Sequence, residues 1–349
     1  MPESRSPVIV PTTDWYPEVE ATHSQRRLRF GVLGCADIAW RRTMPAMSAD
    51  PNIDIVAVAS RKPTKGERFA DRFDCAALSH YEDLLQRSDI DAIYIPLPAM
   101  LHAEWITAAL SAGKHVLVEK PLVDSGQRTA EVIELARSRQ LVLLDNLMFL
   151  HHSQHTTVQK LLAQDTIGEL RCFSSSFTIP PRPENDIRYK EEVGGGALLD
   201  IGVYPLQAAL HFLGPDLDVV GAVLRRESRR QVMVSGNALL CTPEGVIAEV
   251  SFGMEHSYRT TYELSGSSGR IFLDRVFTPP DTYQPVVHID RQDHREEIVL
   301  PADRQFANVL RFFFNAVLDG TDVTPHQNAA IRHAMLSDEI RAKARVIDF

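Results

Sequence analysis

Cysteine is scarce in this chain. Its 349 residues include four cysteines, Cys35, Cys75, Cys172 and Cys241, and no two of them form a CxxC pair. Disulfide frameworks and zinc knuckles both require cysteines at short, repeated spacings. Neither a disulfide-bonded secreted domain nor a metal site is predicted, and we expect a reducing, cytoplasmic location.

The chain also lacks a block of basic residues. Lysine and arginine number 37 against 46 aspartates and glutamates, and the net charge is −9. A surface that binds nucleic acid or anionic lipid needs clustered positive charge. The N-terminus has no signal-peptide pattern, and no segment approaches the roughly 20 apolar residues that span a bilayer. We expect a small-molecule partner, with no nucleic acid and no membrane.

The length predicts two domains, because 349 residues exceed the size at which one core usually keeps growing. Residues 1–26 contain four prolines and are predicted to form a flexible arm. Trp15 and Tyr16 leave open a second interpretation, in which the arm docks onto the body or onto a neighbouring subunit.

Residues 27–147 alternate short apolar runs with helical stretches, which is the pattern of a parallel sheet covered on both faces. The predicted strands are Leu28–Leu33, Ile55–Ala59, Ala92–Leu97, His115–Val118 and Leu141–Leu144, and the predicted helices include Ala103–Ala112 and Gln127–Arg139. This half is predicted to be an α/β domain of the Rossmann type that binds a dinucleotide.

Residues 148–349 show period-two alternation, which is typical of an antiparallel sheet with one buried face. The predicted strands are Leu170–Ile179, Gln231–Cys241, Val246–Phe252, Arg259–Leu264 and Val286–Asp290, and the predicted helices are Ala197–Phe212, Gln305–Leu318 and Asn328–Ala344. A C-terminal α+β domain with a large, mostly antiparallel open sheet follows, for substrate binding and oligomerisation. Its uncovered sheet face predicts a homodimer or homotetramer.

A variant of the dinucleotide fingerprint follows the first predicted strand. It reads Gly34, Cys35, Ala36, Asp37, Ile38, Ala39, and Trp40 and Arg41 come next. The first glycine of this motif makes the tight turn, and small residues let backbone N–H groups approach a pyrophosphate at a helix N-terminus. A turn that merely needs small residues is the alternative, and the position after the first strand favours cofactor binding.

The second strand ends in Ser60 and Arg61, where an NAD enzyme would carry an acidic residue for the ribose 2′-hydroxyl. A carboxylate would repel a 2′-phosphate, whereas a hydroxyl and a guanidinium can hold one. NADP(H) is the predicted cofactor. The alternative for Arg61 is a solvated loop charge.

Glu119, Lys120 and Pro121 follow the fourth strand, at the carboxyl edge of the sheet where ligands of open α/β folds lie. Pro121 restricts the backbone of Lys120 and allows a cis peptide bond that would direct its side chain. An ordinary strand-end lysine before a turn proline is the other interpretation.

The Glu-Lys-Pro segment, together with residues 194–205 (GGGALLDIGVYP), resembles the Gfo/Idh/MocA oxidoreductase family over nearly the whole chain after the arm. The resemblance implies that Lys120, Asp200 and Tyr204 meet beside the nicotinamide. Asp200 and Tyr204 are four residues apart, so on a helix they share one face.

Longer shared runs are similar to the sugar C-3 ketoreductases of deoxysugar biosynthesis. They are residues 34–42, 101–105, 149–152, 177–181 and 277–280. This resemblance implies NADPH-dependent reduction of the 3-keto group of a dTDP-linked 4-keto-2,6-dideoxyhexose, in the biosynthesis of an unusual sugar for a natural product such as an antibiotic. A dehydrogenase of a free sugar, polyol or dihydrodiol and a non-catalytic dinucleotide sensor are the alternatives.

A tyrosine usually keeps its proton at neutral pH, so Tyr204 is suited to donate one to a nascent alkoxide. The Lys120 ammonium would stabilise the oxyanion and lower the pKa of Tyr204. The reverse assignment, with Lys120 as the proton donor, stays open.

Four further residues are site candidates. By family position, Leu97 and His102 border the cofactor together with Glu119 and Lys120, although His102 fits a helix-capping role nearly as well. Asn146 and Arg188 are candidates for substrate binding. Asn146 can instead satisfy local backbone groups, and Arg188 has the planar donor pattern that suits phosphate oxygens.

The histidines His151, His152 and His155 have a spacing that permits a metal site on one helix face. No acidic or cysteine partner lies near them in the sequence, and hydride transfer to a ketone does not need a metal. No metal is therefore predicted.

Overall fold

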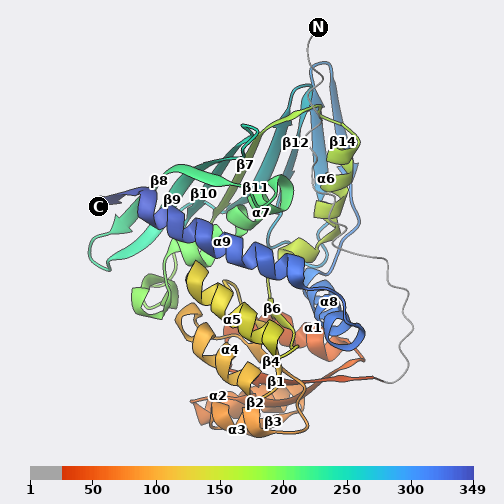
Figure 1. The fold of residues 1–349 in the computed structure, drawn as a ribbon, viewed down its shortest axis with the longest axis vertical. Helices are drawn as coiled ribbons and strands as arrows, with labels where there is room; N and C mark the ends of the chain where they lie inside the picture. The colour runs from red at the N-terminus through yellow and green to blue at the C-terminus, as the bar shows by residue number, and fades with distance from the viewer. Residues whose placement is uncertain (1–25) are drawn as a thin grey trace.

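The computed structural model describes residues 26–349. Residues 1–25 lie outside the described residues, and with them Trp15, Tyr16 and nearly all of the predicted arm. The described chain forms two β-sheets, and the long helix α9 (Thr324–Lys343) runs between the smaller and the larger one (Figure 1).

The first half forms a parallel sheet of six strands in the order β3-β2-β1-β4-β5-β6. The strands are β1 (Leu28–Leu33), β2 (Ile53–Ala59), β3 (Ala76–Leu78), β4 (Ala92–Ile95), β5 (His115–Val118) and β6 (Leu143–Asp145). The order reverses between β1 and β4, and dinucleotides bind at this switch point in folds of this class. The predicted Rossmann-type sheet is confirmed, with β3 as an additional strand.

Helices cover both faces of this sheet, and they are α1 (Met44–Ala49), α2 (Pro63–Phe73), α3 (Tyr81–Gln86), α4 (His102–Ser111) and α5 (Gly126–Ser138). Phe30 and Val32 of β1 point into one apolar core, and Leu33 points into the other. Strands buried on both faces are apolar throughout, which is why the sequence pattern located them well.

The second half forms a nine-stranded sheet in the order β14-β13-β12-β11-β7-β10-β9-β8-β15. The strands are β7 (Leu170–Thr178), β8 (Asp218–Glu227), β9 (Val232–Cys241), β10 (Ile247–Gly253), β11 (Arg259–Gly266), β12 (Gly269–Asp274), β13 (Val286–Arg291), β14 (His294–Val299) and β15 (Ala344–Asp348). The pairs β7 with β10 and β8 with β15 are parallel, and the other pairs are antiparallel. The predicted mostly antiparallel sheet is confirmed.

The helices of the second half are α6 (Ser153–Ala163), α7 (Val203–Leu213), α8 (Gln305–Asp319) and α9. Helix α9 begins four residues before its predicted start at Asn328, because Pro325 occupies the first turn, where its missing N–H costs no hydrogen bond. A π-helical turn, Leu198–Gly202, precedes α7, and the first half has a similar turn, Ala39–Thr43, before α1.

The last two helices hold the two halves together. The rings of Phe30 in β1 and Phe313 in α8 have centroids 5.6 Å apart. At the start of α5 the Gly126 N–H donates to the Asp338 carboxylate of α9 over 2.8 Å. The predicted boundary near residue 147 therefore separates the two sheets, whereas α8 and α9 also pack on the Rossmann half.

The stretch Glu191–Leu213 is long and apolar enough to cross a membrane by length and composition, which corrects the expectation that no segment approaches that length. However, 72% of its most apolar window is buried inside the protein. It packs as a core helix of the second half and carries Asp200 and Tyr204.

Candidate active site

The fingerprint turn has the geometry that a dinucleotide requires. Gly34 has a φ of +111°, which favours glycine, and a Cβ atom there would lie 2.6 Å from the Leu97 side chain. Ala39 is fully buried, so the helix packs closely on the sheet. The close contact with Leu97 therefore requires glycine at position 34, and the predicted contact of Leu97 with the cofactor stays a prediction.

Trp40 and Arg41, the last two predicted cofactor residues of this turn, contact other side chains of the protein. The ring of Trp40 packs on α2, with its centroid 4.9 Å from that of Phe69 and with the Arg72 guanidinium 4.1 Å above it. This packing fixes the ring of Trp40 beside α2, and its predicted contact with the cofactor stays a prediction. Arg41 forms an exposed ion pair with Asp37 at 2.6 Å, which neutralises a carboxylate that would repel phosphate.

Ser60 and Arg61 lie beside the fingerprint turn. The Ser60 hydroxyl donates to the carbonyl of Lys62 over 3.0 Å. Burial raises the pKa of the Cys35 thiol, while a hydrogen bond with Ser60 and the charge of Lys65 act in the opposite direction. These contacts bring a hydroxyl and nearby positive charge to the end of β2, which fits a 2′-phosphate.

Arg61 is not an isolated loop charge. Burial raises the pKa of Tyr81, and the charge of Arg61 and its hydrogen bond with the Tyr81 hydroxyl lower it. Lys65 and Tyr81 were not predicted as part of this site. Lys65 lies four residues after Arg61, about one helical turn, and this spacing was the signal that could have identified it.

Lys120 connects the two domains through an ion-pair network. Its Nζ donates to Oδ1 of Asp200 over 2.8 Å and to the Asp200 carbonyl over 2.5 Å. Nε of Arg188 donates to the other carboxylate oxygen over 2.6 Å, and Nη1 of Arg188 lies 3.2 Å from Asp186. The Lys120-Pro121 peptide bond is cis, the form that the sequence allowed.

The network keeps Asp200 ionised. Burial alone would raise the pKa of Asp200, but the charges and hydrogen bonds of Lys120 and Arg188 outweigh it and hold that pKa well below its ordinary value. Arg188 is thus a charge partner of Asp200, and a substrate diphosphate would have to share its guanidinium with two carboxylates.

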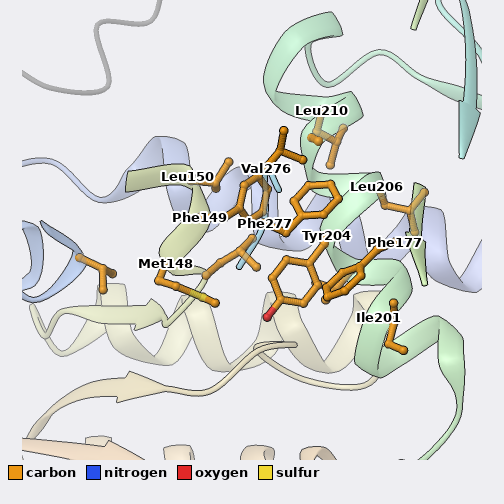
Figure 2. Packing of buried hydrophobic residues seen from close by; sticks show 14 of the residues in the cluster. Met148, Phe149, Leu150, Phe177, Ile201, Tyr204, Leu206, Leu210, Val276 and Phe277 are labelled. Carbon is orange, nitrogen blue, oxygen red and sulfur yellow. The ribbon is translucent and has the colours of Figure 1, made fainter. Parts of the chain in front are cut away.

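Tyr204 lies in an aromatic wall formed by the second domain. Its ring centroid is 4.9 Å from that of Phe177, 5.6 Å from that of Phe277 and 5.7 Å from that of Phe149. Figure 2 shows the hydroxyl of Tyr204 pointing away from these rings. The wall holds the ring and leaves the hydroxyl as its polar edge.

Lys120 and Tyr204 are neighbours, with Nζ of Lys120 5.2 Å from the Tyr204 ring centroid. Lys120 therefore faces both Asp200 and Tyr204, as their helical spacing predicts. The expected lowering of the Tyr204 pKa is wrong for this arrangement. Burial raises that pKa well above its ordinary value, and the charges of Glu119 and Asp200 add to the increase.

Asn146 is fully buried and binds its neighbours. Its Nδ2 donates to Oε1 of Glu119 over 2.7 Å and lies 3.3 Å from the Thr43 hydroxyl. The partners of the Asn146 side chain are thus side chains and not the local backbone groups of the alternative, and its contact with substrate stays a prediction. Glu119 itself is partly exposed, so it can still face the cofactor.

His102 joins two loops at the carboxyl edge of the sheet. It is fully buried, with Nε2 2.8 Å from the Leu97 carbonyl and Nδ1 2.9 Å from the Pro121 carbonyl. It is the first residue of α4 and makes no capping hydrogen bond. His102 therefore positions the loops around Leu97 and Lys120 and has no exposed surface for a cofactor contact.

The predicted histidine cluster is packed into the apolar core. Nδ1 of His155 lies 3.1 Å from the Tyr262 hydroxyl, and Nδ1 of His152 accepts from the Gln154 N–H. Within residues 26–349, no group of three or more His, Cys, Asp or Glu side chains is arranged to hold a metal ion.

Comparisons with known proteins agree with this geometry. The model of the oxidoreductase family with an NAD-binding Rossmann fold matches residues 28–146, and the GFO/IDH/MocA C-terminal domain model matches residues 155–272. The chain is 58% identical over 321 residues to a dTDP-3,4-didehydro-2,6-dideoxy-alpha-D-glucose 3-reductase of Streptomyces antibioticus, covering 92% of this chain and 98% of that protein.

A solved structure supports the same relationship. The crystal structure of a 3-ketoreductase from Actinomadura kijaniata in complex with NADP and TDP-benzene superposes with a TM-score of 0.91 at 55% identity, covering 93% of this chain and all of that one. An aldose-aldose oxidoreductase from Caulobacter crescentus, at 20% identity and a TM-score of 0.83 over 91% of this chain and 97% of that one, shares the fold alone.

Proposed function

The chain belongs to the GFO/IDH/MocA oxidoreductase family, and we propose that it is an NADPH-dependent sugar 3-ketoreductase. Its substrate is a nucleotide-linked sugar, a dTDP-linked 4-keto-2,6-dideoxyhexose with a keto group at C-3, and it acts in the biosynthesis of an unusual sugar. The observation that carries the proposal is the meeting of Lys120, Asp200 and Tyr204 at the carboxyl edge of the Rossmann sheet.

The similarity extends beyond the fold. The Streptomyces relative is a 3-reductase of a dTDP-linked didehydro-dideoxyglucose, and the Actinomadura enzyme binds NADP together with TDP-benzene. Variants of the Actinomadura enzyme replace one lysine or one tyrosine, and those two positions are 84 residues apart. Lys120 and Tyr204 are also 84 residues apart.

The cofactor proposal rests on the fingerprint turn and the end of β2. Gly34 allows the backbone to approach a pyrophosphate, and Ser60 and Arg61 supply the donors for a 2′-phosphate. When bound, NADPH supplies a hydride to the keto carbon of the substrate.

Lys120 and Tyr204 stabilise and neutralise the negative charge that this transfer places on the keto oxygen. The raised pKa of Tyr204 keeps its hydroxyl protonated at neutral pH, so it holds the proton that the alkoxide needs. The Lys120 ammonium stabilises the developing oxyanion. Asp200 orients Lys120 through two hydrogen bonds, and Arg188 balances the second oxygen of Asp200.

The aromatic wall holds the ring of Tyr204 in place. Phe177 and Phe277 are almost fully buried against Tyr204, so they fix its ring without competing for its hydroxyl.

Assembly and location complete the proposal. We propose a homodimer or homotetramer formed through the outer face of the nine-stranded sheet, where Val220, Leu239 and Ile247 are exposed. The four free cysteines are compatible with the reducing cytoplasm.

The decisive experiment is an NADPH-consumption assay with enzymatically generated dTDP-3,4-didehydro-2,6-dideoxyglucose, with the product identified by mass spectrometry. We expect NADPH-dependent gain of two hydrogen atoms and no turnover of free sugars or polyols with NADP+. Turnover of a free sugar with inert nucleotide sugars would instead indicate a dehydrogenase, and hydride transfer to none of them would indicate a sensor.

A further inference from the structure

A buried hydrogen-bonded network lies under the active site. The Tyr94 hydroxyl is 2.7 Å from Oε1 of Glu119 and 2.9 Å from the Thr43 hydroxyl. Nδ2 of Asn146 is 2.7 Å from the same Oε1. These four residues come from the turn before α1 and from the ends of β4, β5 and β6, so the network ties together four segments that meet at the cofactor edge.

The chemistry of the donors fixes the direction of these bonds. A tyrosine hydroxyl has one proton, and an ionised carboxylate can only accept. Tyr94 therefore donates to Glu119, and the Thr43 hydroxyl donates to Tyr94 while it accepts from Asn146. Two donors converge on one oxygen of Glu119, and such bonds favour the charged form of a carboxyl group.

Glu119 is suited to act on the nicotinamide half of the cofactor. Each mononucleotide-binding half of a Rossmann sheet takes one nucleotide. Ser60 and Arg61 follow β2 and belong to the 2′-phosphate half, so the nicotinamide falls to β4, β5 and β6. Glu119 follows β5 directly, is partly exposed, and has only Oε1 engaged by Tyr94 and Asn146.

We propose that Glu119 is a carboxylate which favours the oxidised, cationic form of the nicotinamide ring, and that Tyr94 is the positioning residue which holds it there. Hydride transfer takes two electrons and one hydrogen nucleus from the ring, and the ring becomes positively charged. A fixed negative charge nearby stabilises that product and the transition state leading to it. The inference rests on the proposed function only in that NADP(H) is the cofactor.

The pKa of Glu119 is raised above its ordinary value, and hydrogen bonds limit the increase. Burial raises its pKa, whereas the hydrogen bonds from Tyr94 and Asn146 and the charge of Lys120 lower it. Removal of the Tyr94 hydroxyl takes away one of the groups that keep Glu119 ionised. Tyr94 thus acts through Glu119, which distinguishes it from a residue that only fills the core.

The test compares the affinities of the protein for NADP+ and NADPH, measured separately by titration without substrate. We expect Glu119→Gln to weaken NADP+ binding relative to NADPH binding by about tenfold or more, because a charge pair in a partly buried site is lost. Tyr94→Phe should shift the same ratio in the same direction by about two- to fivefold.

Tyr262→Phe is the matched control, because Tyr262 is similarly buried and its hydroxyl lies 3.1 Å from Nδ1 of His155 within the core of the second domain. If Tyr94→Phe does not fold, Thr43→Val removes the donor to Tyr94 and tests the same chain of bonds. Equal changes in both affinities on Glu119→Gln would overturn the role of Glu119. A ratio in Tyr94→Phe that matches Tyr262→Phe would overturn the role of Tyr94.

These outcomes are separable from the proposed function. If the protein binds NADP(H) with the expected ratios but reduces no 3-keto sugar, the assignment of substrate fails and the role of Glu119 stands. If the sugar is reduced but the affinity ratios for NADP+ and NADPH do not change in the variants, the role of Glu119 fails and the assignment of substrate stands.

Discussion

The two sides of the active site are held together by different kinds of interaction. The Rossmann side presents a hydrogen-bonded floor in which Tyr94 and Asn146 hold Glu119. The other side presents an aromatic wall in which Phe177 and Phe277 hold Tyr204. The residues of the floor are joined by hydrogen bonds, and the residues of the wall by aromatic packing. Lys120 is the residue that reaches from one to the other.

This difference has a physical basis. A buried hydrogen bond to a charged group costs much when one partner is lost, because the other stays desolvated. The loss of an aromatic contact costs mainly buried area and packing, because it leaves no polar group unpaired. Substitutions on the floor should therefore change charge and affinity, and substitutions in the wall should change stability and fit.

The largest expected effect on the reaction comes from substitutions of Lys120 and Tyr204, the two residues that meet between the floor and the wall. Lys120→Ala should lower the single-turnover rate of keto reduction by about 10²- to 10³-fold, because the oxyanion loses its cation. Tyr204→Phe should lower it by about 10²-fold through loss of the proton donor. Lys160→Ala, at an exposed site in α6, serves as the control. Near-wild-type rates in both active-site variants would remove the proposed mechanism.

The wall itself is tested by Phe277→Ala. Phe277 is fully buried among Phe149, Phe177 and Tyr204, so its truncation should lower the free energy of unfolding by about 3–5 kcal/mol. Val299→Ala, at a residue 62% exposed in β14, should change it by less than about 0.5 kcal/mol. Chemical denaturation measures both. Equal stabilities would mean that the wall repacks without cost.

Acid should destabilise the second domain and the helices that pack on it. Burial lowers the pKa of His211 and of His333 to about 4 and that of His326 to about 3. Above an unfolded-state pKa of about 6.5 these groups are neutral in both states. As the pH falls below that value the unfolded chain takes up protons first, so stability is lost down to about pH 4.

Asp145, at the end of β6, acts in the opposite direction. Burial raises the pKa of Asp145 to about 7, so this group favours folding increasingly as the pH falls from 7 toward its unfolded value of about 4. These three histidines outweigh this one aspartate, and together the four groups should make the free energy of unfolding fall by roughly 3 kcal/mol per pH unit near pH 5. Denaturant midpoints measured across that range test the sum, and a flat profile would contradict it.

The smallest effect is expected at Arg61, which follows β2 on the Rossmann side. Arg61→Ala should raise the KM for NADPH by about tenfold and leave that for NADH unchanged, because only the 2′-phosphate contact is removed. Arg139→Ala, at an exposed arginine beyond α5, is the control. Equal changes with both cofactors would show that Arg61 supports the fold of the turn and not the 2′-phosphate.

Features that are local in the chain were predictable. The apolar runs of β1, β2 and β5 located the Rossmann sheet, and the fingerprint after β1 located its cofactor turn. The exposed or irregular strands β8, β12, β14 and β15 were not identified. β14, for example, is polar along most of its length, so it has no alternation to reveal it, and its pairing with β13 is formed across the sheet.

Site residues divide in the same way. Lys120, Asp200 and Tyr204 stand in short motifs, and the structure brings them together. Thr43 and Tyr94 stand in no motif, and they are 51 residues apart in the chain. A tyrosine within an otherwise apolar buried strand was the available signal, because its hydroxyl must find a partner. The identity of that partner depended on how the strands lie side by side.

The amino-acid sequence by itself determined the Rossmann pattern, the cofactor turn and the residues that meet at the site, because each is encoded by neighbours within one element. Tertiary structure alone decided what those residues do to one another. It paired the Arg188 guanidinium with the Asp200 carboxylate and packed the Trp40 ring on α2. It also buried Tyr204 among aromatic rings and near carboxylates, which raises the pKa of Tyr204. Burial and charge at a point in space depend on segments far apart in the chain, and no local pattern records them.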